Sequence, residues 1–297
     1  MPANTSLPDR SRPDAAGFVR AALASALAQV HTHAHAVAAG GGEAEPIHQL
    51  RVGLRRLRTV LRECAGLAPA IRGEWDAPLA RAFACLGTLR DAATLADVAQ
   101  PLLQAAGAPL CEWAPPEAPR EEAAAAVREP GFVRALAEIQ ALALAPDGKG
   151  RGGFAALSAS GTRRYLSRRL RRLHRQVLRD GCRFDGLPLE EQHRVRKRLK
   201  RLRYLSEFAR ECAPGLWPAG KGRRFAQALA PAQDALGLHN DIAVASDLFR
   251  DEAARDPRAW FAAGYLQAHL ASSARAGRRA LRALARVPAF WDGAHQR

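Results

Sequence analysis

The sequence predicts an all-α protein, and three observations support this prediction. Apolar residues recur at spacings of three and four along most of the 297-residue chain, as on the buried face of a helix. These stretches are rich in alanine, leucine and arginine, which favour helices, and contain few β-branched residues. Clusters of glycine and proline separate the stretches. We therefore expect helices joined by turns and no strand.

Eight helices are expected between the breaks. In chain order they cover residues 14–39, 46–65, 74–106, 119–145, 154–180, 188–213, 222–253 and 257–287. Pro101, Pro130 and Pro231 fall inside three of these segments, where a missing backbone donor kinks or splits a helix. Four helices precede the segment 146–153, which we interpret as a linker, and four follow it. We expect two tandem four-helix bundles, residues 14–145 and 154–290, after a flexible N-terminus of residues 1–13.

Charge is the strongest feature of the composition. Lys and Arg number 45 against 29 Asp and Glu, which gives a formal net charge of +16. A folded surface of this charge repels itself unless a polyanion or counterions neutralise it. Only Lys149, Lys197, Lys200 and Lys221 are lysines, so most of the charge is guanidinium, whose planar fork suits phosphate oxygens. Since the chain uses arginine heavily throughout, the positions of the arginines must decide whether the charge has a function.

Several classes of protein are disfavoured. No apolar run approaches the roughly 20 residues that span a bilayer, so no membrane association is expected. The N-terminus has no secretory signal, which favours the cytoplasm. The 5 cysteines are scattered and never spaced as Cys-x-x-Cys, which argues against a disulfide framework or a thiolate zinc site. We expect no metal and no cofactor, and the oligomeric state is left open.

A repeated motif is the most informative pattern. The second expected helix of the first half contains His48-Gln-Leu-Arg51-Val-Gly-Leu-Arg55-Arg56-Leu57-Arg58. The second expected helix of the other half contains His193-Arg-Val-Arg196-Lys-Arg-Leu-Lys200-Arg201-Leu202-Arg203. A weaker echo follows each copy, Leu86-Gly87-Thr88-Leu89-Arg90-Asp91 and Leu236-Gly237-Leu238-His239-Asn240-Asp241. The two halves are therefore predicted to be duplicates with pseudo-symmetry.

Each copy of the motif predicts a basic stripe beside an apolar one. At about 100° per residue, the side chains of Arg51, Arg55, Arg58 and Arg62 lie within about 80° on one side of His48. Leucines occupy an adjacent face, and Arg56 points elsewhere. In the second copy His193, Arg196, Lys200 and Arg203 form the stripe and Arg201 takes the place of Arg56. Glu207 stands where the first copy has Arg62.

The fifth expected helix adds a third basic row. Its members are Arg164, Arg168, Arg171, Arg175 and Arg179, which share one face opposite a row of leucines. Like charges three or four residues apart destabilise an isolated helix by roughly 0.2–0.5 kcal/mol per pair. A single run of this kind is usually a solvated face, but recurrence of the stripe in register argues for a ligand. Three rows favour a linear polyanion that crosses several helices over a small phosphate ligand.

The doubled motif and its echo resemble the CHAD family, the conserved histidine α-helical domain, over residues 18–287. The resemblance implies two pseudo-symmetric four-helix bundles around a basic groove that binds inorganic polyphosphate without catalysis, often at polyphosphate granules in bacteria. It places in the groove His48, Arg51, Arg55, Arg56, Arg58, His193, Arg196, Lys200, Arg201 and Arg203; to these we add Arg62, Lys197 and the row on the fifth helix. Asp91 and Asp241 match the family's acidic position and are expected either to orient neighbouring arginines or to form ion pairs within the bundle.

Two other functions stay open. An arginine groove also attracts the backbone of RNA or DNA, although no aromatic residues are interleaved with the stripes to stack bases. A polyphosphate-processing enzyme would need Mg²⁺, for which Asp91, Asp97, Asp241 and Asp247 are the candidate ligands. The stretch from Gly215 to Lys221 resembles a P-loop but lacks its Ser or Thr and contains Pro218, so an interhelical turn is favoured.

Overall fold

The computed structural model describes residues 12–40, 44–94, 98–108, 120–145 and 153–292, and every regular element in this part of the chain is helical. The α-helices are α1 (Ala15–Ala38), α2 (Ala44–Cys64), α3 (Asp76–Thr94), α4 (Gln100–Ala105), α5 (Arg120–Arg128), α6 (Pro130–Leu144), α7 (Ala159–Gly181), α8 (Leu189–Glu211), α9 (Ala219–Glu252) and α10 (Ala259–Ala285). Short 3₁₀ turns cover Gly73–Trp75 and Phe184–Gly186. The prediction of an all-α fold is confirmed.

Local sequence explains where several helices begin. The Asp14 carboxylate accepts a hydrogen bond from the backbone N–H of Gly17 at 2.8 Å and caps α1. Ser158 caps α7 in the same way, through the N–H of Gly161 at 3.4 Å. Glu129 accepts from the N–H of Phe132 at 2.9 Å, just before the proline that opens α6.

The prolines account for the difference between the expected helices and the observed ones. Pro101 lies in the first turn of α4, so the expected segment 74–106 is divided into a 3₁₀ turn, α3 and α4. Pro130 opens α6 and separates it from α5. In the first turn of a helix the missing N–H of proline is not needed, which makes both positions natural starts. Pro231, in contrast, does not divide α9, which packs extensively against α10.

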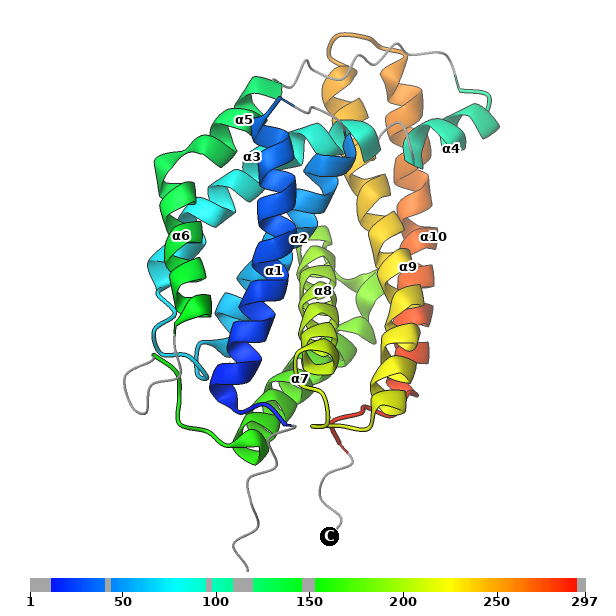
Figure 1. Cartoon of the computed structure of the whole chain (residues 1–297). Helices are drawn as coiled ribbons and strands as arrows, with labels where there is room; N and C mark the ends of the chain where they lie inside the picture. Colours follow the sequence, from blue (N-terminus) through cyan, green and yellow to red (C-terminus); the bar gives the residue numbers. More distant parts are fainter. Residues whose placement is uncertain (1–11, 41–43, 95–97, 109–119, 146–152, 293–297) are drawn as a thin grey trace, which may run out of the picture.

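The helices are arranged around α2 and α8 (Figure 1). Helix α1 packs along α2, and α3, α5 and α6 cover the outer side of this pair. On the other side of α8 stands the long hairpin of α9 and α10, while α7 contacts both α8 and α10. Helices α2 and α8, which carry the two copies of the motif, contact each other.

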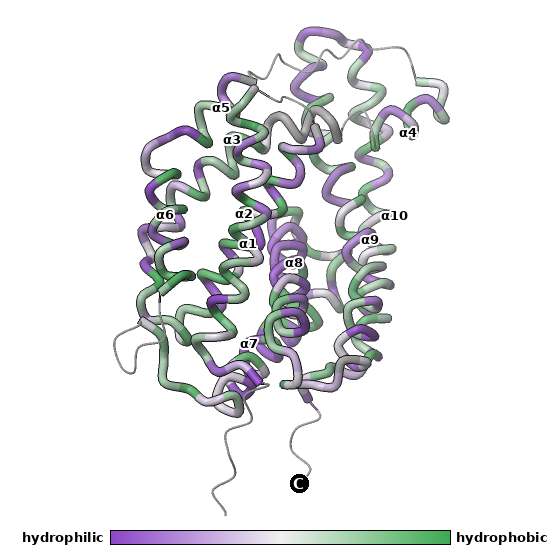
Figure 2. Tube along the Cα trace, viewed as in Figure 1, coloured by the Kyte–Doolittle hydropathy of each residue, from purple (hydrophilic) through white to green (hydrophobic). Residues whose placement is uncertain are grey.

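Most buried apolar residues of the described chain form one core that contains residues from both halves, for example Leu54 and Phe132 with Leu170 and Phe225. A smaller cluster joins α4 to the α9–α10 hairpin through Leu103. The halves thus share their main core, and their pseudo-symmetry stays a prediction. Hydrophilic residues recur along α7 and α8 (Figure 2), and none of the described helices is long and apolar enough to cross a membrane.

Candidate functional site

A groove with a volume of about 850 Å³ is lined by α2, α8 and α9, with contributions from α3. Both copies of the motif therefore border the same space. The cationic side chains that line it are Arg51, Arg55, Arg58, Arg62, Arg194, Arg196, Lys197, Arg198, Lys200 and Arg201, and the imidazole of His193 lies among them. The acidic ones are Asp76, Glu190, Asp241 and Asp247. Since basic side chains outnumber acidic ones, the groove has a positive potential.

On the α2 side, the arginines are held against α3. Leu50, Leu54 and Leu57 are fully buried, which turns the adjacent basic stripe toward the groove. The guanidinium of Arg51 donates a hydrogen bond to the carbonyl oxygen of Phe83 at 2.7 Å and lies 4.3 Å above the centre of its ring. The guanidinium of Arg55 lies 5.0 Å from the same ring. These contacts fix where both charges stand.

Gly87 explains one part of the weaker echo motif. A Cβ atom on this residue would lie 3.0 Å from the Nη1 atom of Arg51, closer than an ordinary contact. The absence of a side chain thus lets the guanidinium of Arg51 pack against α3. Asp91 lies four residues farther along the chain, near the end of α3, and its side chain is outside the described part of the structure.

An acidic residue that the sequence analysis missed orients Arg58. Asp76, at the start of α3, accepts hydrogen bonds from Nε of Arg58 at 2.7 Å and from Nη2 at 2.9 Å. These hydrogen bonds hold the pKa of the Asp76 carboxyl below its ordinary value, although partial burial opposes the effect. The forked contact fixes the plane of the guanidinium at the groove wall.

On the α8 side, α9 positions the motif residues. The Nδ1 atom of His193 lies 2.8 Å from Oδ1 of Asn240, and Nδ2 of Asn240 donates to Asp241 at 3.4 Å. Nη2 of Arg196 lies 3.7 Å from Oδ1 of Asp241. Because the amide nitrogen of Asn240 faces Asp241, its oxygen accepts the Nδ1–H of His193, which leaves Nε2 of the imidazole for another partner. Asp241 therefore stands beside an arginine of the groove.

The cations of α2 and α8 are close enough for arginines of α2 to lower the pKa of Lys197 on α8. Burial lowers the pKa of Lys197, and so do the nearby charges of Arg55 and Arg58 on α2 and of Arg196 on α8. Burial also lowers the pKa of His193; the hydrogen bond to Asn240 opposes this effect, and the charges of Lys197, Arg196 and Lys200 add to it. Each added proton in the groove is opposed by the positive charges already there. A bound anion would remove this opposition.

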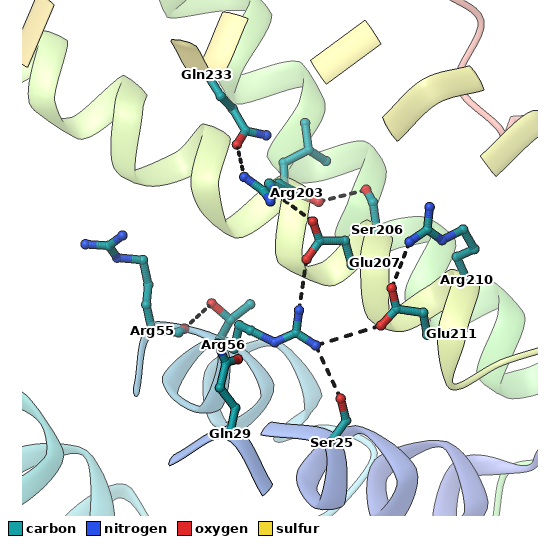
Figure 3. A network of polar contacts seen from close by, with 12 residues as sticks. Ser25, Gln29, Arg55, Arg56, Arg203, Ser206, Glu207, Arg210, Glu211 and Gln233 are labelled. Atoms are coloured by element: carbon teal, nitrogen blue, oxygen red, sulfur yellow. Dashed lines mark hydrogen bonds and ion pairs between the residues drawn. The ribbon is translucent and has the colours of Figure 1, made fainter. Parts of the chain in front are cut away.

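Arg56 and Arg203, which were expected to line the groove, lie outside it. Nη1 of Arg56 lies 3.1 Å from Oε2 of Glu207, and Nε of Arg203 lies 2.6 Å from Oε1 of the same carboxylate (Figure 3). Arg56 also donates to Ser25 at 3.3 Å and lies over the ring of Phe208. In contrast, the side chain of Arg55 is directed away from this network (Figure 3). The reason for the difference is Glu207, which draws both arginines to the contact between α2 and α8.

A second ion pair crosses the same two helices in the other direction. The carboxylate of Glu63 on α2 is buried, 2.7 Å from Nη2 of Arg169 and 3.6 Å from Nη1 of Arg201. Arg201 occupies the position in its motif that Arg56 occupies in the first copy. We call Arg56–Glu207 and Arg201–Glu63 the crossed ion pairs. Each joins the arginine of one copy to a glutamate on the helix of the other copy, so the pairs fix how α2 and α8 lie relative to each other.

The arginine row of α7 does not reach the groove. Its apolar stripe packs into the core, which turns the opposite face outward and leaves Arg164, Arg168, Arg175 and Arg179 exposed. Arg171 pairs with Asp292 at 2.9 Å instead. His48 is half-buried and is likewise not part of the groove lining.

The sequence analysis overlooked other lining residues. Arg194 and Arg198 belong to α8, and Arg198 contacts Asp180 of α7. His239 is buried where α8, α9 and α10 meet, with Nε2 at 2.7 Å from Oε1 of Gln192 and Nδ1 at 2.8 Å from the hydroxyl of Ser273. His239 and Asn240 stand inside the echo motif of the second half, which was the available signal.

Comparisons with known proteins agree with this architecture. A family model described as CHAD domain matches residues 21–250. The chain is also similar to the crystal structure of the CHAD domain from the plant Ricinus communis, with a TM-score of 0.71 and 27% sequence identity over 97% of this chain and 98% of that one. No curated protein matches the chain.

Proposed function

Starting from the fact that this chain belongs to the CHAD domain family, we propose that it binds inorganic polyphosphate in the groove between α2 and α8. One observation carries the proposal: the basic stripes of the two motif copies border one space. Arg55, Arg62 and Lys197 line this space and form no ion pair with an acidic side chain in the described part of the chain. An anion that binds among these positive charges would relieve their mutual repulsion, so this part of the groove favours an anionic ligand.

Polyphosphate matches the groove chemically. It carries nearly one negative charge per phosphorus atom along a linear chain, and guanidinium forks bind its oxygens in pairs. Because Nδ1 of His193 donates to Asn240, its Nε2 atom donates to a phosphate oxygen when the imidazole is protonated. Because binding releases counterions from the polymer, the affinity should fall steeply with salt, as it does for nucleic-acid backbones.

Nucleic acid is the second candidate, and the aromatic residues of the groove argue against it. Single-strand binders stack bases on exposed aromatic rings. Phe83 is occupied by the guanidinium groups of Arg51 and Arg55, and Phe184 is buried beside the ring of His239. The described lining therefore offers charge and no stacking surface, which favours a ligand without bases.

We propose binding without hydrolysis. The two carboxylates best placed to hold Mg²⁺ beside a phosphate, Asp76 and Asp241, both face arginines, so their charge is used to orient guanidinium groups. The proposal includes a role in holding the protein at polyphosphate granules in the cytoplasm. Incubation with polyphosphate and Mg²⁺, followed by measurement of released phosphate, tests the first part, because any turnover above buffer contradicts it.

Charge reversal in the groove tests the binding site. The double variant Arg55→Glu with Lys197→Glu should abolish retention on immobilised polyphosphate while helicity by circular dichroism stays unchanged. The matched control is Arg134→Glu with Arg223→Glu, which changes two exposed arginines away from the groove and alters net charge equally. The control should still bind. Equal loss in both variants, or retention in the groove variant, refutes the assignment.

Competition separates the two ligands. Single-stranded RNA, added at a phosphate concentration equal to that of long-chain polyphosphate, should fail to displace the polyphosphate. Displacement of polyphosphate by RNA would favour nucleic acid as the ligand of the groove.

A further inference from the structure

A second basic surface lies outside the groove, on α7 and α10. Its members are exposed arginines on the outward faces of the two helices and at the end of α10: Arg164, Arg168, Arg172, Arg175, Arg275, Arg279, Arg282 and Arg286. We call this set the α7–α10 arginine face. None of its residues lines the groove. The function proposed above therefore leaves these charges unexplained.

The two helices that carry the face are neighbours. A Cβ atom on Gly181, the last residue of α7, would lie 2.8 Å from Cδ1 of Leu281 on α10, so the helices approach closely there. Ten residues earlier in α7, Arg171 contacts Asp292, which follows α10. The helices therefore run antiparallel along this contact. Their C-terminal parts lie side by side, with Arg175 six residues before Gly181 on α7 and Arg282 next to Leu281 on α10.

Acidic residues are nearly absent from this surface. Helix α10 contains no Asp or Glu, and α7 contains only Asp180. That carboxylate is already engaged by Arg179 and by Arg198 of the groove wall. None of the eight arginines of the face forms an ion pair within the described part of the chain. The spacings of three and four residues place like charges next to each other on each helix, which is unfavourable without an anion.

The face is separate from the groove. The apolar stripe of α7, with Leu166, Leu170 and Val177, is fully buried in the core, and the arginines stand on the opposite side of the helix. The groove is bordered by α8, whose Arg198 reaches Asp180 at the flank of α7. A polymer held in the groove would therefore not touch the outward side of α7. Two surfaces of the same sign on different sides of one molecule can bind two strands.

We propose that the α7–α10 arginine face binds a second strand of inorganic polyphosphate, so that one protein molecule bridges two strands; this rests on the proposed function of the groove. Bridging requires only that the two surfaces bind independently. A population of such molecules links polyphosphate chains into a network, whereas a protein with the groove alone coats a chain. Because the face is exposed while the groove is partly enclosed, salt screens the face more strongly. Bridging should therefore disappear at a lower salt concentration than binding.

Energy transfer between labelled polymers tests the proposal. Two batches of long-chain polyphosphate carry a donor or an acceptor dye at their ends, and the full-length protein is added to the mixture. Wild type should raise the transfer signal. The variant Arg172→Gln, Arg175→Gln and Arg282→Gln should lose the signal, while its affinity for a short polyphosphate chain and the salt dependence of that affinity stay at wild-type values.

The matched control changes three exposed arginines elsewhere, Arg134→Gln, Arg223→Gln and Arg224→Gln, and should bridge like wild type. Circular dichroism and melting check that both variants fold. Persistent transfer in the face variant means that the face is only a solvated surface and overturns the inference. Equal loss in the control also overturns it, because bridging would then follow net charge. If wild type does not bind the short chain, the proposed function of the groove fails as well, which distinguishes the two failures.

Discussion

Arg55 and Arg56 are neighbours in the sequence, yet they belong to two different regions of the contact between α2 and α8. Arg55 lines the groove, where cations stand together without carboxylates to neutralise all of them. Arg56 takes part in the crossed ion pairs, where each arginine meets a glutamate of the facing helix. Consecutive arginines on one helix can therefore have different roles, because they point to different faces. One face carries the arginines available to an anion, and another carries the arginines that hold two helices together.

The two regions should respond in opposite ways to mutation. In the crossed ion pairs, loss of a carboxylate leaves a partly buried arginine without its partner, so stability falls. In the groove, loss of a cation removes repulsion, so stability is kept or gained while binding falls.

Removal of the buried carboxylate should have the largest effect. Glu63→Gln leaves Arg169 and Arg201 without their shared partner, and breaking a buried pair costs about 3–5 kcal/mol. Denaturant unfolding measures the loss. Glu74→Gln is the control, because its pair with Arg72 is exposed and should contribute about 0–1 kcal/mol. If Glu63→Gln loses no more stability than the control, Glu63 does not hold α2 and α8 together.

The other crossed pair should have a smaller effect. Glu207→Gln weakens the contacts to Arg56 and Arg203. The side chain of Glu207 is 15% exposed against 3% for Glu63, and we expect a loss of about 1.5–3 kcal/mol. Glu211→Gln, whose contact to Arg56 is 3.8 Å long, should cost less. If the two variants are equally stable in denaturant unfolding, Glu207 does not hold the helices together.

Removal of a positive charge inside the groove should not lower stability, unlike the two changes in the crossed ion pairs. Lys197→Met removes a partly buried charge that stands near Arg55, Arg58 and Arg196. We expect the free energy of unfolding to stay equal or to rise by about 0.5 kcal/mol, the size of a relieved like-charge contact. Calorimetric titration should show weaker polyphosphate binding by the same variant. Lower stability together with unchanged binding would place Lys197 among the structural residues.

Protonation of His193 should give the smallest effect. Burial and the surrounding cations lower its pKa below the ordinary value of about 6.5. The stability that this residue contributes to the free protein is therefore present above about pH 6.5 and is lost as pH falls through the lowered pKa. A bound polyanion raises the pKa again. Binding should therefore take up a proton and strengthen as pH falls toward the lowered pKa of His193 in the free protein.

Calorimetric titration in buffers of different ionisation enthalpy measures this proton uptake. The variant His193→Gln should abolish the part of the uptake that His193 contributes. Unchanged uptake in the variant would show that His193 does not face the ligand.

The sequence predicted those features that depend on one helix. The spacing of Leu50, Leu54 and Leu57 identified the buried face of α2, and the same arithmetic placed Arg51 and Arg55 on its basic side. It also placed the arginines of α7 opposite their leucines. The sequence did not show whether each basic face lies in the groove, at a contact between helices or on the outer surface. That depends on how helices distant in the sequence pack against each other.

Residues that act through tertiary contacts were missed for the same reason. Asp76 orients Arg58 from the start of another helix, and Asn240 holds His193 from α9. Glu207 was recognised only as a departure from the repeat, although it decides where Arg56 and Arg203 point. A departure from an otherwise regular repeat was the signal that a side chain had a different partner.

Protection of individual arginines tests the central claim most directly. The protein is treated with phenylglyoxal in the presence or absence of saturating polyphosphate, and mass spectrometry maps the modified residues. The account predicts that polyphosphate protects Arg55 and Arg62 in the groove while Arg134 and Arg223 stay reactive. Groove arginines that remain reactive under saturation, or uniform protection of all four, would contradict it.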